Sequence, residues 1–324
     1  MVRFLILFLF SFVLHAVDYD CAFIGSSPIS LCEALYRSSL GERVLILEQS
    51  PECGGAWKSI DICGIPHVDM GCHDVTWSDQ NLTKFFEDYL GCRIVSFSNP
   101  ALSVQSGSCW FSRGCYELIH NILTLIAQTS IDLRLNHRLE RVTFNPTDHS
   151  VVLAVEGMKF FTAKKIYTTP LSSFAVNQQP VPTHRGKYYH LYLLVADATM
   201  PKFVSGYLGA SGVSRMMNLT HSANLDNSGR QLIVLQTSSE ADFSRGQYFL
   251  DQLKQKNFLD PSAYLLRAES YIFEATYGGV NIHQLTPEER SCIEMLHTGS
   301  LGGMSSYISK WKQTFKPLNK ASSF

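Results

Sequence analysis

The clearest pattern of apolar and polar positions in the chain lies shortly after its start. An apolar run at 21–24 leads into turn-forming residues at 25–28, and a second apolar run at 44–47 ends in Glu48. Between the two runs, apolar side chains recur at the spacing of one helix face: Ile29, Leu31, Cys32, Leu35 and Tyr36. Two short apolar runs that flank an amphipathic helix predict a strand–helix–strand unit.

The same kind of pattern continues along the rest of the chain. Segments with one apolar face predict further helices at 79–90, 116–128, 247–256 and 307–311. Apolar and aromatic stretches predict strands at 133–144, 188–195 and 231–236, and a hairpin at 151–169. Together these elements predict an α/β fold, with a Rossmann-like nucleotide-binding domain and an inserted α+β domain.

The turn before the first helix has the chemistry of a phosphate-binding loop. A helix N-terminus offers unpaired N–H groups and the positive end of a dipole, and glycine lets the backbone approach a ligand closely. The dinucleotide motif G-x-G-x-x-G retains its first glycine as Gly25, with Ser27 and Ser30 in the other glycine positions. Serine is small and can bond a phosphate, so we expect weakened binding rather than none. An ordinary α/β turn with one glycine is the alternative for this loop.

Glu48 strengthens the nucleotide interpretation. It follows the second strand about 20 residues beyond the loop, where nucleotide-binding units place a carboxylate on the ribose hydroxyls. The same carboxylate would repel a 2′-phosphate. The unit is therefore predicted to bind an adenine dinucleotide with an unphosphorylated ribose.

The segment from Glu48 to Val75 resembles a motif of the flavin-dependent amine oxidase superfamily, which includes phytoene desaturase, protoporphyrinogen oxidase and UDP-galactopyranose mutase. The features that carry the resemblance are an acidic residue, a glycine pair, a short hairpin and an Asp-x-Gly-x-His segment, here Glu48, Gly54, Gly55, Gly64 and 69–73. The usual arginine after the glycine pair is absent, and Ala56-Trp57-Lys58 stands there instead. Lys58 offers a positive charge without the fork geometry of a guanidinium.

Two later segments continue the resemblance. Residues 113–119 are similar to a glycine-containing helix entry of the superfamily, and 297–304 are similar to its glycine-rich C-terminal motif. The resemblance implies FAD as cofactor. The residues that it assigns to the cofactor are Gly25, Ser26, Ser27, Pro28, Glu48, Gly54, Gly55, Ala56, Trp57, Gly71, Gly299, Ser300 and Leu301.

The resemblance also implies a division of the chain. The FAD-binding domain is expected to comprise 17–73, 131–170 and 291–324. A helical cap part is expected at 74–130, and a substrate domain at 171–290.

The N-terminus has the pattern of a secretory signal. Arg3 is followed by a thirteen-residue stretch rich in Phe and Leu, and cleavage is predicted after Ala16, so that 1–16 would be a signal peptide. The stretch is short for a membrane-spanning helix. We expect entry into the secretory pathway or export, with membrane contact through this segment alone. A buried segment of a cytoplasmic protein is the alternative.

The composition of the chain argues against some classes of binding partner. The chain has 324 residues, a formal net charge of −1 and scattered basic residues, which argues against nucleic acid as a partner. Its nine cysteines form no C-x-x-C pair, and we predict no metal site. In an oxidising compartment we expect Cys109 and Cys115 to form a disulfide.

Few residues stand out as catalytic candidates. The resemblance places His73 near the flavin ring, and Arg215 is a cationic candidate for an anionic substrate. A satisfied buried histidine and a solvated surface arginine are the respective alternatives.

These observations predict an FAD-dependent oxidoreductase. Such an enzyme would transfer a hydride from a small amine, thioether or unsaturated substrate to the flavin. The alternative is an exported binding protein or pseudoenzyme that retains the fold without redox activity. A non-redox mutase is a third class, but it needs a crowd of Arg and Tyr side chains that the sequence does not reveal.

Overall fold

The computed structural model describes most of the chain. The described residues are 18–73, 75–76, 80–97, 108–157, 159–169, 174–176, 184–196, 205–206, 208, 212–226, 228–277, 285–296 and 301–317. The predicted signal segment, Gly299 and Ser300 lie outside these residues.

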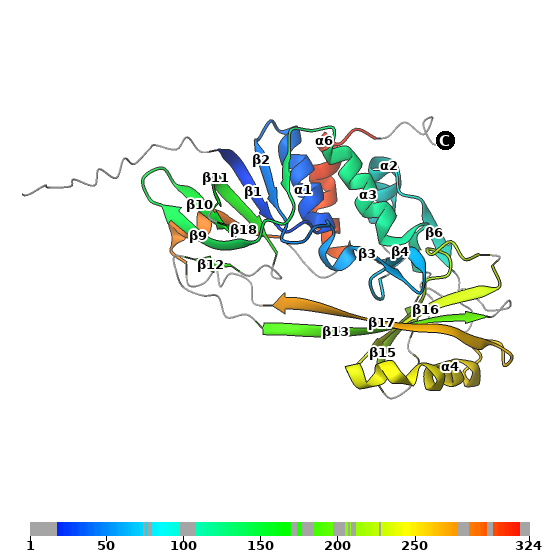
Figure 1. The fold of residues 1–324 in the computed structure, drawn as a ribbon. Coiled ribbons are helices and arrows are strands. Elements are labelled where there is room, and N and C mark those ends of the chain that lie inside the picture. Colours follow the sequence, from blue (N-terminus) through cyan, green and yellow to red (C-terminus); the bar gives the residue numbers. More distant parts are fainter. Residues whose placement is uncertain are drawn as a thin grey trace, which may run out of the picture.

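A parallel sheet forms the centre of the larger part of the molecule (Figure 1). Its strands lie in the order β8 (Asp132–Arg134), β2 (Val44–Leu47), β1 (Tyr19–Ile24), β11 (Lys159–Thr168) and β18 (Ile293–Met295), all parallel. The first half of β11 also pairs with β10 (Ser150–Val155) in an antiparallel hairpin, which continues through β9 (Leu139–Asn145) to β12 (Ala175–Val176). The strand–helix–strand unit and the hairpin expected at 151–169 are confirmed.

Both faces of the parallel sheet are buried, which explains the unbroken apolar runs. Cys21 and Phe23 of β1 pack with the helices α1 (Pro28–Ser39), α2 (Gln80–Leu90), α3 (Gly114–Ile126) and α6 (Ser305–Thr314). Ala22 and Ile24 face the opposite way and pack with residues of the β9–β11 strands. In Figure 1 the helices accordingly lie on one side of the sheet and the antiparallel strands on the other.

Several short elements connect this layer to the rest of the molecule. The strands β3 (Ser59–Ile62) and β4 (Ile65–Asp69) form a hairpin, and β5 (Val75–Thr76), β7 (Ser108–Phe111) and β6 (Ile94–Phe97) form a small sheet. The remaining short helices are η1 (Gly55–Trp57), η2 (Glu240–Arg245), α5 (Pro287–Ser291) and η4 (Leu301–Met304).

A second, antiparallel sheet lies below the hairpin in Figure 1. Its order is β14 (Ser205–Gly206), β15 (Val213–Asn218), β16 (Arg230–Thr237), β13 (His184–Ala196) and β17 (Tyr264–Tyr277). One face packs on α4 (Gly246–Gln255). Apolar residues of the other face belong to the same core as α1 and α3.

The structure corrects some details of the predicted elements. The helix expected at 116–128 begins at Gly114 and ends at Ile126. The disulfide expected between Cys109 and Cys115 is wrong, because both residues are buried thiols outside any disulfide. Among the described helices, none combines the length and apolar character that crossing a bilayer requires.

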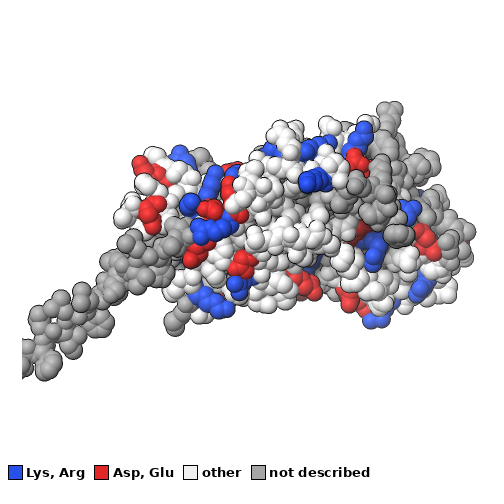
Figure 2. All heavy atoms as spheres, turned by 90° about the horizontal axis from the view of Figure 1, so that it is seen from above, with Lys and Arg blue, Asp and Glu red and all other residues white. Residues whose placement is uncertain are grey.

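Charged side chains of both signs are interspersed on the face drawn in Figure 2. Asp20 pairs with Lys164 at 2.8 Å and with Arg43 at 3.5 Å.

Candidate functional site

The first loop is shaped by one glycine and one capping serine. Gly25 ends β1 with a positive φ of +89°, a conformation that favours glycine. Ser27 then caps α1, because its Oγ accepts the N–H of Ser30 at 3.3 Å. Pro28 occupies the first helical position and has no N–H. The serines that replace the motif glycines thus satisfy part of the helix N-terminus themselves.

Glu48 joins this loop to the end of β2. Its Oε2 accepts the backbone N–H of Ser26 at 2.9 Å and the Ser26 hydroxyl at 2.6 Å, while Oε1 accepts the N–H of Ser50 at 2.8 Å. The side chain of Glu48 is buried, so these bonds are protected from water. The predicted ribose carboxylate therefore stands in a fixed orientation beside the predicted phosphate loop.

The glycine pair is held against the same loop. The N–H of Gly54 lies 3.1 Å from both the carbonyl and the hydroxyl oxygen of Ser26. Gly54 has a φ of +114°, and a side chain there would meet Lys58 N at 3.1 Å. Beside Gly55 there is open space, with no atom within 4 Å of the position that a Cβ would take. The structure thus brings the loop, Glu48 and the glycine pair together, as the sequence predicts.

The Asp-x-Gly-x-His segment is anchored by a fully buried carboxylate. Asp69 accepts the indole N–H of Trp110 at 2.7 Å and the backbone N–H of Cys115, at the start of α3, at 2.6 Å. Burial raises the pKa of Asp69 to about 6, although both hydrogen bonds act in the opposite direction. Gly114 makes this contact possible, because a Cβ there would lie 2.7 Å from Asp69 Cγ.

Gly71 connects this segment to the second sheet. Its N–H donates to the hydroxyl of Tyr192 at 2.9 Å, and that hydroxyl donates to the carbonyl of Asp69 at 3.0 Å. Burial raises the pKa of Tyr192 well above its usual value, so the phenol remains protonated. The predicted site is therefore bounded on one side by the layer that contains the parallel sheet and on the other by the antiparallel sheet.

His73 is fixed by its backbone surroundings. Its Nε2 lies 3.1 Å from the carbonyl of Ala56 and 3.0 Å from that of Met70, so Nε2 carries the proton and donates. The ring stacks on Trp57, with 4.3 Å between the ring centroids. His73 and Trp57, both predicted near the cofactor, thus lie against each other, and Ala56 holds the imidazole by its carbonyl.

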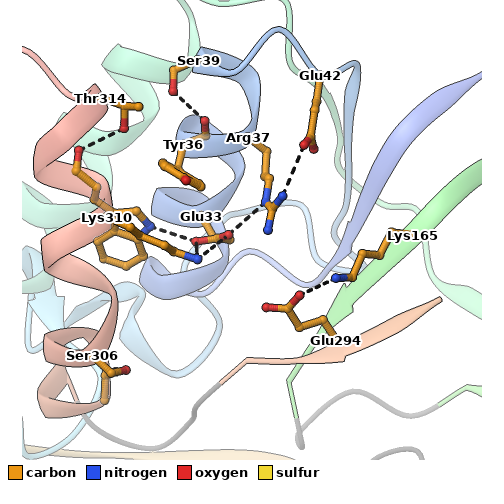
Figure 3. Close-up of polar contacts among 12 residues, drawn as sticks. Glu33, Tyr36, Arg37, Ser39, Glu42, Lys165, Glu294, Ser306, Lys310 and Thr314 are labelled. Atoms are coloured by element: carbon orange, nitrogen blue, oxygen red, sulfur yellow. Dashed lines mark hydrogen bonds and ion pairs between the residues drawn. The ribbon is translucent and has the colours of Figure 1, made fainter. Parts of the chain in front are cut away.

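The other predicted residues lie further away. Leu301 begins η4, which packs against α1, and Arg215 is an exposed residue of β15. α6 follows η4 and is joined to α1 through Glu33, a fully buried carboxylate (Figure 3). Glu33 accepts the indole N–H of Trp311 at 2.9 Å and the ammonium of Lys310 at 2.8 Å.

Sequence reasoning did not identify His190. This residue of β13 is 6% exposed, and its Nε2 would lie 2.8 Å from a Cβ at Gly71. Burial, with a smaller contribution from the charge of His73, lowers the pKa of His190 to about 4. The available signal was the alternation of Tyr188, His190 and Tyr192 in a predicted strand, which places the three side chains on one face.

The chain is similar to known proteins in structure but not in sequence. No family model matches this sequence, and no curated protein matches it. A putrescine oxidase variant with redesigned cofactor binding gives a TM-score of 0.62 at 11% identity, over 92% of this chain and 98% of that chain. Reduced UDP-galactopyranose mutase gives 0.62 at 10% identity, over 91% of this chain and 95% of that chain.

NikD, an unusual amino acid oxidase essential for nikkomycin biosynthesis, gives a TM-score of 0.57 at 11% identity, over 91% of this chain and 92% of that chain. This chain has the α/β fold of these oxidases and of the mutase. The predicted α/β fold class is confirmed, because the chain shares its fold with these two oxidases and the mutase. At such identities the likeness concerns the fold alone.

Proposed function

We propose that this protein is an FAD-dependent oxidoreductase that acts on a small organic molecule. The observation that carries the proposal is the network of Ser26, Glu48 and Gly54 at the N-terminus of α1. It places a buried carboxylate, a glycine-led turn and a second close-approach point in one location, within a fold shared with oxidases.

The residues present fit such a cofactor. Glu48 has lone pairs beyond those used by Ser26 and Ser50, and a carboxylate in this position accepts ribose hydroxyls. The hydroxyls of Ser27 and Ser30 lie 2.9 Å apart at the start of α1, and a helix N-terminus of this kind would hold a diphosphate. The open space beside Gly55 leaves room for a ligand close to the backbone.

The chain's own groups would orient the reactants. When bound, the flavin supplies the capacity to accept a hydride. Trp57 and His73 form a flat aromatic wall, and the bonds from His73 to two carbonyls keep its ring in one orientation. In this arrangement His73 acts first as a positioning residue. A role in proton transfer at Nε2 would require that nitrogen to give up those carbonyls.

A binding protein without redox activity is the second candidate. The observation that favours it is the partly self-satisfied start of α1, where Pro28 lacks an N–H and Ser27 occupies that of Ser30. Fewer donors then remain for a diphosphate.

Anaerobic reduction of the FAD-loaded protein separates the two candidates. Panels of small amines, amino acids and thioethers are added, and the visible flavin absorbance is followed. The proposal predicts that at least one compound bleaches the flavin at a rate that saturates with its concentration. Retained FAD that no compound reduces would favour the binding protein.

A further inference from the structure

A row of polar side chains crosses the antiparallel sheet. In its register Arg215 lies opposite Gln236, Gln236 opposite His190, and His190 opposite Tyr271. Directly paired residues of antiparallel strands point to the same face, and neighbouring strands are about 4.8 Å apart. These four side chains, here called the polar row, therefore line one face together.

The polar row lies on the face turned toward the Asp69–His73 segment. The adjacent row contains Met217, Val234 and Tyr192, which are buried in the core shared with α1 and α3. Met217 Sδ lies 3.3 Å from the backbone N of His73, and Tyr192 bonds Gly71. The polar row thus begins where the packed contact with the Asp69–His73 segment ends.

His190 is the buried member of the polar row. Only 6% of the surface of this residue is exposed, and yet its Nδ1 has no hydrogen-bond partner among the described residues. An unpaired buried polar group is destabilising, so its retention calls for an explanation. A bound molecule that pairs with Nδ1 supplies one.

We propose that His190 contacts the substrate through Nδ1, and that the polar row selects small molecules carrying a carboxylate. Guanidinium, amide, imidazole and phenol groups all offer donors, whereas an ionised carboxylate only accepts. Arg215 is the exposed end of the row and can bind both carboxylate oxygens. The inference rests on the proposed function, since it names the substrate class of the same site.

Binding of matched probes tests the inference. The FAD-treated full chain is titrated with acetate, benzoate and phenylacetate, and with their primary amides, by saturation-transfer NMR. We expect at least one carboxylate to bind about 10-fold more tightly than its amide. His190→Leu should weaken that binding about 10-fold, whereas His190→Asn, whose amide N–H lies near the position of Nδ1, should stay within about 3-fold. The exposed His120 provides the control variant, His120→Leu, with unchanged binding.

A measurement on the wild type covers the case in which His190→Leu does not fold. Saturating carboxylate should shift the Nδ1 resonance of His190 in long-range ¹H–¹⁵N spectra and leave that of His120 unchanged. The inference is overturned if no carboxylate binds, or if each carboxylate binds no more tightly than its amide. It is also overturned if His190→Leu and His190→Asn weaken binding equally, or if the Nδ1 resonance of His190 does not shift. Flavin absorbance of the same samples gives a separate result. Probe binding without retained flavin would contradict the proposed cofactor while supporting the polar row.

Discussion

Glu48 Oε2 accepts two hydrogen bonds from one residue, Ser26, at 2.9 Å from the backbone N–H and 2.6 Å from the hydroxyl. The end of β2 is thereby tied to the first turn after β1. Because the carboxylate is buried and already oriented, a ribose would meet a preorganised acceptor.

Replacing Glu48 with Ala should weaken FAD binding by about 10-fold or more, because a charged hydrogen-bond acceptor contributes about 1.5–3 kcal/mol. Flavin fluorescence titration measures the dissociation constant. Glu52→Ala is the matched control, since Glu52 is a nearby exposed carboxylate. Unchanged affinity in Glu48→Ala would remove the ribose assignment.

Glu33 should be essential for stability. It is fully buried and accepts bonds from Trp311, Lys310 and Arg37, so Glu33→Ala leaves these donors without their carboxylate (Figure 3). Removing one partner of a buried ion pair costs about 3–5 kcal/mol. Glu42→Ala, which removes the other carboxylate beside Arg37, should cost less than about 1 kcal/mol. Urea denaturation of both variants tests the contrast, and similar losses would contradict it.

His190 should make the stability depend on pH. Its folded pKa of about 4 lies below the ordinary 6.5, so the unfolded chain takes up a proton first as the pH falls. The free energy of unfolding should therefore decrease between pH 6.5 and 4, by about 3 kcal/mol from this group. Asp69, whose pKa is raised from 3.8 to about 6, acts in the opposite direction as the pH falls through that range.

The difference between wild type and His190→Asn isolates the histidine from Asp69. We expect the stability of the wild type relative to the variant to fall from pH 6.5 to 4 and to level off below that range. A difference that does not change with pH would show that His190 is not buried in its neutral form.

Gly114 should tolerate no side chain. Gly114→Ala combines a positive φ of +62° with a Cβ 2.7 Å from Asp69 Cγ, on the side that caps α3. Gly157→Ala has a comparable φ of +81° and open space, so it isolates the backbone cost of about 1–2 kcal/mol. Thermal unfolding should show a clearly larger loss for Gly114→Ala. Equal losses would mean that the Asp69 contact adjusts at little cost.

The parts of the site that depend on local sequence could be predicted. Gly25, Glu48 and the strand–helix–strand unit to which they belong follow from apolar runs, a turn and their spacing, because this unit is defined within a short segment. The hydrogen bond from Ser26 to Glu48 could not be predicted from the residue types alone. It forms because the loop after β1 lies beside the end of β2.

The contacts that join distant segments were not predictable. Glu33 lies on an apolar helix, and its partner Trp311 is 278 positions away in the sequence. His190 meets Gly71 because the register of β13 and the packing of the antiparallel sheet place it there. Such pairings are determined by tertiary packing, and a single sequence carries no local signal for them.

FAD binding is assigned above to the Ser26–Glu48–Gly54 network. Its most direct test is the visible absorption spectrum of the purified protein, before and after incubation with FAD and gel filtration. We expect flavin bands that co-elute with the wild-type protein and are lost or strongly reduced in Glu48→Ala. A folded wild-type protein that elutes without flavin in both samples would contradict it.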